Sequence, residues 1–137
     1  MKSGLNIEEL SKNTKVLVAD DEDSLRVLLA AVINSEDGFD FTEAIDGDDT
    51  LEKVKADKPE ILILDVMMPG KTGFEVCEIL KQDPEYQDIE IIILTAKGQE
   101  SDQEWAKSCG ADYFLKKPFS PLELIDILKS IKSKINK

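Results

Sequence analysis

Short apolar segments and amphipathic stretches alternate along the chain, and turn-forming residues separate them. The apolar segments have the length of β-strands, and one of them, Ile61–Leu64, is apolar at every position. A strand of that kind is typical of the centre of a parallel sheet that helices cover on both faces. The predicted strands are Val16–Ala19, Phe39–Ala44, Ile61–Leu64, Ile89–Leu94 and Asp112–Leu115.

Helical spacing of apolar residues predicts the elements between these strands. After Asp23–Ser24, a possible cap, one helical face carries Leu25, Leu28, Leu29, Val32 and Ile33. The other internal helices are predicted at Gly47–Lys55 with Leu51 and Val54 toward the core, after Gly73 with Phe74, Cys77 and Leu80 inward, and at Gly98–Cys109 with Trp105. Gly110 suits the left-handed position that ends a helix.

The last helix has the clearest boundary signal. Ser120 as N-cap, Pro121 at the first helical position and Glu123 three residues after Ser120 form a capping-box pattern. Its predicted core stripe is Leu124, Ile127, Leu128, Ile131 and Ile135. Five strands alternating with five helices predict an α/β fold with a parallel sheet.

Length and composition fit one domain with a real core. The chain has 137 residues, 42% of them hydrophobic, and no apolar stretch near the ~20 residues that span a bilayer. Residues 1–13 read as a short extension before a domain at 14–137, and they lack the apolar region of a secretory signal. We therefore expect a cytoplasmic protein.

The charge balance constrains the class of partner. With 17 basic and 29 acidic residues the net charge is −12, which argues against non-specific binding to nucleic acid or to anionic membranes. A protein partner is expected instead. Cys77 and Cys109 are far apart in sequence and have no CxxC or histidine context, so free thiols are expected.

Residues suited to phosphoryl chemistry follow four of the predicted strands. They are Asp20–Asp21, Asp65, Thr95 and Lys117. The carboxyl ends of parallel strands meet at one edge of the sheet, so these side chains should converge. Each residue singly could be solvated surface or strand, since acids are common in this chain, but their conjunction at four strand ends favours a site.

The residue types also assign chemical roles. Carboxylates of Asp20, Asp21 and Asp65 are ligands that Mg²⁺ prefers, and crowded carboxylates need a cation. Asp65 ends the most apolar strand and is the expected nucleophile, able to form an acyl phosphate. Lys117 supplies positive charge and Thr95 a hydroxyl to the phosphoryl group.

The whole set resembles the receiver domain of two-component response regulators. The resemblance runs from about Lys15 onward, and it rests on Asp20–Asp21, Asp65–Gly70 with Gly73–Phe74, Leu94–Ala96, Gly110–Asp112 and Lys117–Phe119. It implies a flavodoxin-like (βα)5 doubly wound sheet with strand order 2-1-3-4-5. It also implies that a histidine kinase, a phosphotransfer protein or a small acyl phosphate phosphorylates Asp65.

The same resemblance implies a metal site and a switch. Mg²⁺ or Mn²⁺ would be bound by Asp21, Asp65 and the main-chain carbonyl of Met67, with Asp20 acting through water, and Lys117–Pro118 would be cis. Thr95 would move toward the phosphoryl group while Phe114 turns inward, which reshapes the surface of the fourth helix, fifth strand and fifth helix. Met67 and Lys97 would border the phosphoryl group, and because neither is an obvious base we expect slow dephosphorylation.

Alternatives remain open at this level. The chain could be a stand-alone receiver that contacts a downstream protein, or the receiver part of a larger DNA-binding regulator. Ile127 stands where winged-helix regulators usually have an arginine of their dimer interface, which favours a monomer. A haloacid-dehalogenase-type phosphatase would want an acid where Met67 stands, and a receiver that no longer accepts phosphate would lack some of the residues present. A signalling domain is therefore expected, not an enzyme.

Overall fold

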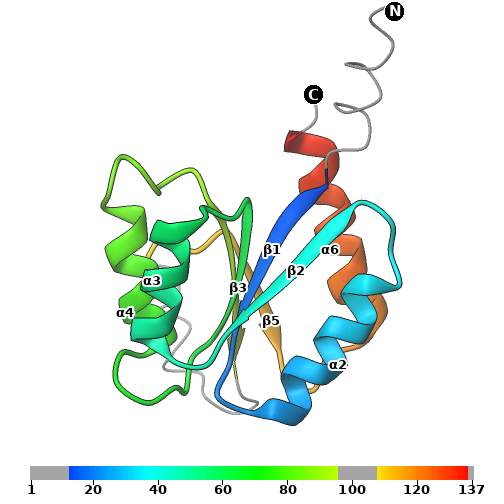
Figure 1. The fold of residues 1–137 in the computed structure, drawn as a ribbon, viewed down its shortest axis with the longest axis horizontal. Helices are drawn as coiled ribbons and strands as arrows, with labels where there is room; N and C mark the ends of the chain where they lie inside the picture. The colour runs from blue at the N-terminus through cyan, green and yellow to red at the C-terminus, as the bar shows by residue number, and fades with distance from the viewer. Residues whose placement is uncertain (1–12, 96–107, 136–137) are drawn as a thin grey trace, which may run out of the picture.

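The computed structural model describes residues 13–95 and 108–135. Five parallel strands form one sheet in the order β2-β1-β3-β4-β5, as predicted (Figure 1). Each strand lies within two residues of its predicted bounds. The strands are β1 (Thr14–Ala19), β2 (Phe39–Ala44), β3 (Ile61–Asp65), β4 (Glu90–Thr95) and β5 (Tyr113–Lys116).

Helices cover both faces of the sheet, so the fold is doubly wound. In Figure 1, α3 (Gly47–Ala56) and α4 (Gly73–Lys81) lie on one side, and α2 (Asp23–Asn34) and α6 (Pro121–Ile135) on the other. Most of the helix predicted at Gly98–Cys109, including Trp105, lies outside the described residues. No helix in the described ranges is long and apolar enough to cross a bilayer.

The sheet separates two hydrophobic clusters because alternate residues of a strand point to opposite faces. Leu62 and Leu64 of β3 pack with α3 and α4, whereas Ile61 and Ile63 pack with α2 and α6. All five residues of β3 are buried. The inward positions predicted for α4, Phe74, Cys77 and Leu80, are confirmed.

Two predicted core positions are wrong. Leu28 is 50% exposed and Ile135 is 37% exposed. A helix on a sheet buries only a narrow stripe, and in α2 that stripe is Leu29, Ile33 and, unexpectedly, Arg26. Ile135 is the last residue of α6, where packing against the sheet ends.

The helix ends agree with the sequence in part. The first residue of α2 is Asp23, and its N-cap, Glu22, makes no side-chain capping bond, so the cap predicted at Asp23–Ser24 is wrong. At α6, Glu123 Oε1 accepts from Ser120 N at 3.0 Å, as predicted, whereas Ser120 Oγ accepts from Leu122 N. Gly110 has φ +91°, which confirms the expected left-handed residue.

Candidate functional site

The residues predicted from the strand ends lie together at the carboxyl edge of the sheet. Asp20 follows β1, Asp65 and Thr95 are the last residues of β3 and β4, and Lys117 follows β5. Asp20 is fully buried, and Asp65 is only 5% exposed. Backbone hydrogen bonds hold the neighbouring strand ends together, from Val66 N to Leu94 O at 3.2 Å and from Lys117 N to Thr95 O at 2.7 Å.

The ammonium of Lys117 lies between two carboxylates. Its Nζ donates to Asp65 Oδ1 at 2.9 Å and lies 3.7 Å from Asp20 Oδ2. Burial lowers the pKa of Lys117, but the hydrogen bond and charge of Asp65, together with the charges of Asp20 and Glu22, outweigh it, so the pKa is raised. Lys117 therefore stays a cation at neutral pH.

The carboxyl group of Asp20 is the most constrained of the acids. Oδ1 accepts a hydrogen bond from Glu22 N at 2.8 Å, but Oδ2 is buried without a hydrogen bond. Burial raises the pKa of Asp20, and the charge of Asp65 adds to that rise. A buried oxygen in this state is unfavourable unless a ligand or ion meets it.

Three carboxylates converge at this edge of the sheet and form an acidic cluster. Asp20, Asp21 and Asp65 each offer an oxygen, and these oxygens lie within 4.8 Å of one another. Burial also raises the pKa of Asp65, and although the hydrogen bond from Lys117 opposes this, the charge of Asp21 adds to it. Hard oxygens at this spacing fit the donor set of Mg²⁺.

Two backbone features stand out at the site. The Lys117–Pro118 peptide bond is cis, as the resemblance implied. Gly73, the first residue of α4, packs directly on the end of β3: its N donates to Val66 O at 3.0 Å, and an added Cβ would lie 2.4 Å from Asp65 O. Only glycine lets α4 begin this close to Asp65.

The remaining predicted residues lie at the rim or outside the described chain. The side chain of Met67 is 61% exposed, next to the acidic cluster in sequence, and Phe114 on β5 is 41% exposed. Lys97 lies outside the described residues.

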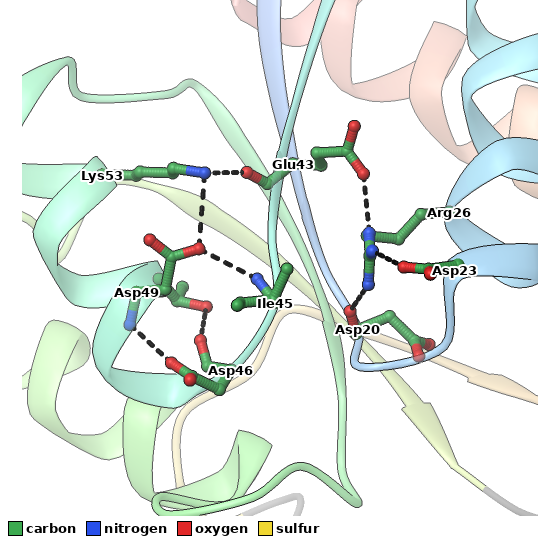
Figure 2. Close-up of polar contacts among 9 residues, drawn as sticks. Asp20, Asp23, Arg26, Glu43, Ile45, Asp46, Asp49 and Lys53 are labelled. Carbon is green, nitrogen blue, oxygen red and sulfur yellow. Dashed lines mark hydrogen bonds and ion pairs between the residues drawn. The ribbon is translucent and has the colours of Figure 1, made fainter.

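Arg26 was not among the predicted site residues. It is the one arginine of the chain, yet it is only 7% exposed, and it lies against the main chain of Asp20 (Figure 2). Its Nη1 donates to Asp20 O at 2.5 Å and its Nε to Glu43 Oε1 at 2.6 Å. A charged residue inside an amphipathic pattern is expected to be exposed. The only sequence feature that could have indicated burial of Arg26 was a possible partner acid, Glu43, 17 residues away.

An apolar groove opens beside the acidic cluster. Side chains of α2 form one wall, and the residues after Lys117 form the other. The apolar residues that line it are Leu25, Leu28, Leu29, Val32, Pro118, Phe119 and Pro121. The half-exposed Leu28, misplaced in the predicted core, belongs to this groove.

Comparison with known proteins agrees with this geometry. The family model of the response regulator receiver domain matches residues 16–129. The alkaline phosphatase synthesis transcriptional regulatory protein PhoP of Bacillus subtilis is 40% identical over 119 residues, which cover 87% of this chain and 48% of that protein. The phosphate regulon transcriptional regulatory protein PhoB of Escherichia coli is 34% identical over 122 residues, 89% of this chain and 53% of that protein. The chain thus spans about half the length of these curated relatives.

Solved structures give the same result. A response regulator from Chloroflexus aurantiacus superimposes with a TM-score of 0.83 at 32% identity, covering 88% of this chain and 98% of that one. The chemotaxis protein CheY4 of Vibrio cholerae gives 0.79 at 30% identity, covering 87% and 98%. With the acidic cluster, the strand order and the family match in agreement, this chain belongs to the receiver domains of response regulators.

Proposed function

We propose that this domain accepts a phosphoryl group on Asp65 and that the reaction depends on Mg²⁺ or Mn²⁺. The observation that carries the proposal is the set of contacts around Asp65. Its carboxylate lies 2.9 Å from Lys117 Nζ and within 4.8 Å of carboxylate oxygens of Asp20 and Asp21. A nucleophile, a fixed cation and a metal-binding acid pair are the parts that phosphoryl transfer requires.

Each side chain has a distinct task in this proposal. Asp20, Asp21 and Asp65, with the carbonyl of Met67, would hold the cation, which when bound neutralises charge on the phosphoryl group. A carboxylate oxygen of Asp65 forms the new bond to phosphorus while the bond from phosphorus to the donor breaks, and the donor leaves with its electron pair. Lys117 Nζ holds a phosphoryl oxygen, and the Thr95 hydroxyl donates to another.

The signal would pass from Thr95 to Phe114. In the structure Phe114 is 41% exposed on β5, the strand paired with β4 through Ile93–Phe114. We propose that Thr95 moves toward the phosphorylated Asp65 and that Phe114 turns inward, which changes the surface seen by a partner. Met67 and Lys97 would border the phosphoryl group, and because neither side chain is an obvious base, dephosphorylation would be slow.

The phosphoryl donor would be a histidine kinase or a phosphotransfer protein on the cytoplasmic side of the membrane. The apolar groove between α2 and Pro118–Pro121 supports such a contact, because Lys117, which also lines it, bonds to Asp65. Val27 on α2 and Leu122 on α6 are 69% and 70% exposed and extend the apolar surface on these two elements. A partner seated there would reach Asp65.

Incubation with acetyl phosphate and Mg²⁺, followed by intact-mass measurement, tests the proposal. We expect one phosphoryl adduct on the wild-type protein and none on Asp65→Asn or in EDTA. If no adduct forms, a fluorescence or NMR titration with beryllofluoride separates a kinase-dependent receiver from a domain that does not bind phosphoryl groups at all. An adduct on Asp65→Asn would contradict the assignment of Asp65.

A second candidate is the receiver part of a larger transcriptional regulator. The names of PhoP and PhoB and the half-length match favour it. In that case the expectations of no nucleic-acid contact and of a monomer would apply to this domain alone, whose net charge is −12. Light scattering with and without beryllofluoride tests the oligomeric part: a phosphorylation-dependent dimer would contradict the monomer predicted from Ile127.

A further inference from the structure

We propose that Arg26 is a positioning residue that holds the metal-binding turn after β1 by its main-chain carbonyl. The inference rests on the proposed Mg²⁺-dependent phosphorylation of Asp65. Arg26 touches no phosphoryl group in this scheme. It acts through Asp20, whose carboxylate belongs to the acidic cluster.

The guanidinium of Arg26 joins three elements. Nη1 donates to the carbonyl of Asp20 at the end of β1, Nε donates to Glu43 on β2, and Nη2 bonds to Asp23 in the first turn of its own helix (Figure 2). A planar fork of donors can hold three acceptors at fixed angles, which a lysine ammonium on a flexible stem cannot reproduce.

The bonds of Asp20 show what this arrangement achieves. Its N donates to Ala44 O at 3.1 Å, its Oδ1 accepts from Glu22 N at 2.8 Å, and its carbonyl accepts from Arg26. The main chain and one carboxylate oxygen are thus held by protein groups. Oδ2, without a hydrogen bond, is left for a ligand.

The positive charge of Arg26 is paired with carboxylates that do not belong to the acidic cluster. Its carboxylate partners are Asp23 and Glu43, whereas it meets Asp20 at the carbonyl. Arg26 therefore steadies the turn without neutralising the carboxylates that would bind a cation. Removing it should change the placement of Asp20 and leave the metal ligands themselves in the protein.

Glu43, the partner of Arg26 on β2, is itself held in place. The main-chain oxygen of Glu43 accepts from Lys53 Nζ at 2.6 Å, and Lys53 Nζ lies 3.3 Å from Asp49 Oδ2 (Figure 2). Asp49 in turn accepts from Ile45 N at 3.0 Å. The contact between Arg26 and Glu43 thus ties the turn after β1 to β2 and α3.

Calorimetric titration of the full chain with Mg²⁺ tests the inference, with Arg26→Met as the main variant. Loss of a residue that orients a metal ligand typically weakens metal binding about 10- to 100-fold, so we expect the Kd of Arg26→Met for Mg²⁺ to rise at least about 10-fold. Acetyl-phosphate labelling of this variant should recover when Mg²⁺ is raised to saturation, because the nucleophile and Lys117 are intact.

Lys132→Met is the matched control. Lys132 Nζ also donates to a main-chain carbonyl, Gly38 O at 2.7 Å, but at the opposite edge of the sheet. The Lys132→Met variant should have a lower unfolding temperature than wild type and an unchanged Kd for Mg²⁺. Equal rises of Kd in both variants would mean that Arg26 acts only through stability, and that result would overturn the inference.

Arg26→Lys decides the question if Arg26→Met does not fold. A lysine keeps the charge and can hold one acceptor, so its Kd should lie between those of wild type and Arg26→Met. Wild-type Kd values in the folded Arg26 variants would overturn the inference while Asp65 labelling stands. A wild-type protein that neither binds Mg²⁺ nor labels would refute the proposed function and, with it, this inference.

Discussion

The two edges of the sheet differ in how far their polar groups are paired by hydrogen bonds. At the amino edge, Lys15 N donates to Glu60 Oε1 at 2.8 Å, and Lys132 Nζ bridges Thr14 Oγ1 and Gly38 O at 3.2 and 2.7 Å. At the carboxyl edge, buried Asp20 Oδ2 has no hydrogen bond, and Lys117 is shared between two acids.

The difference separates the edge that stabilises the domain from the edge where we propose that phosphorylation takes place. Polar atoms at the amino edge hydrogen-bond to one another. Through Lys132, these bonds join α6 to the start of β1 and to the residue before β2. The carboxyl edge keeps acids together whose pKa values are raised by burial. Such an arrangement lowers the stability of the metal-free protein and favours cation binding.

The largest effect should come from Gly73→Ala at the carboxyl edge. The new Cβ would lie 2.4 Å from Asp65 O and 3.1 Å from Val66 Cα, both backbone atoms that cannot move cheaply. We expect the free energy of unfolding to fall by about 3 kcal/mol. Urea unfolding measures it, with Ile79→Ala on the exposed side of α4 as control; equal losses would refute the close-approach argument.

An intermediate effect of opposite sign is expected for Asp20→Asn. In metal-free wild type, the raised pKa of Asp20 means that the folded state holds its proton more tightly than the unfolded state. The contribution of Asp20 to the free energy of unfolding is thus most favourable below the ordinary pKa of 3.8 and is lost as pH rises through the folded pKa. Asp20→Asn avoids this loss and should be more stable than wild type at pH 7 in EDTA.

Unfolding curves from pH 4 to 8 check the sign of that effect. The advantage of Asp20→Asn should grow with pH in EDTA and shrink or reverse when Mg²⁺ is added, because wild type alone would keep the full acidic cluster. A variant less stable than wild type at pH 7 without metal would show that ionised Asp20 stabilises the fold.

The smallest effect should come from Asp57→Asn at the amino edge. Asp57 pairs with Lys15 at 2.6 Å, but the two side chains are 66% and 44% exposed. Exposed ion pairs contribute little because water and salt screen them. Thermal unfolding should not resolve this variant from wild type at 0.15 M salt, and a clear loss would mean that the amino edge depends on its surface charges.

The sequence was sufficient to predict the order of the strands in the sheet and the convergence of the acidic residues. Strand ends in a parallel sheet share an edge, so Asp20, Asp65, Thr95 and Lys117 could be placed together from order alone. The apolar run of β3 also located the centre of the sheet, where both faces are buried.

Contacts that join distant segments could not be predicted in this way. Arg26 is buried because Glu43 and the Asp20 carbonyl lie around it, and neither is near it in a helical repeat. The same helix exposes Leu28, since a groove beside Pro118–Pro121 stands where packing was expected. Helical periodicity predicts which face of a helix points toward the core. The segments that pack around the helix determine which residues of that face are buried.

The burial of Arg26 also determines the chemistry of the surface. It is the one arginine, and the chain has no histidine, so every other basic side chain is a lysine. Unlike guanidinium groups, lysine amines are open to acetylation, which removes their charge. Acyl transfer to these amines would make a chain with a net charge of −12 still more acidic, while the buried guanidinium of Arg26 would keep its charge.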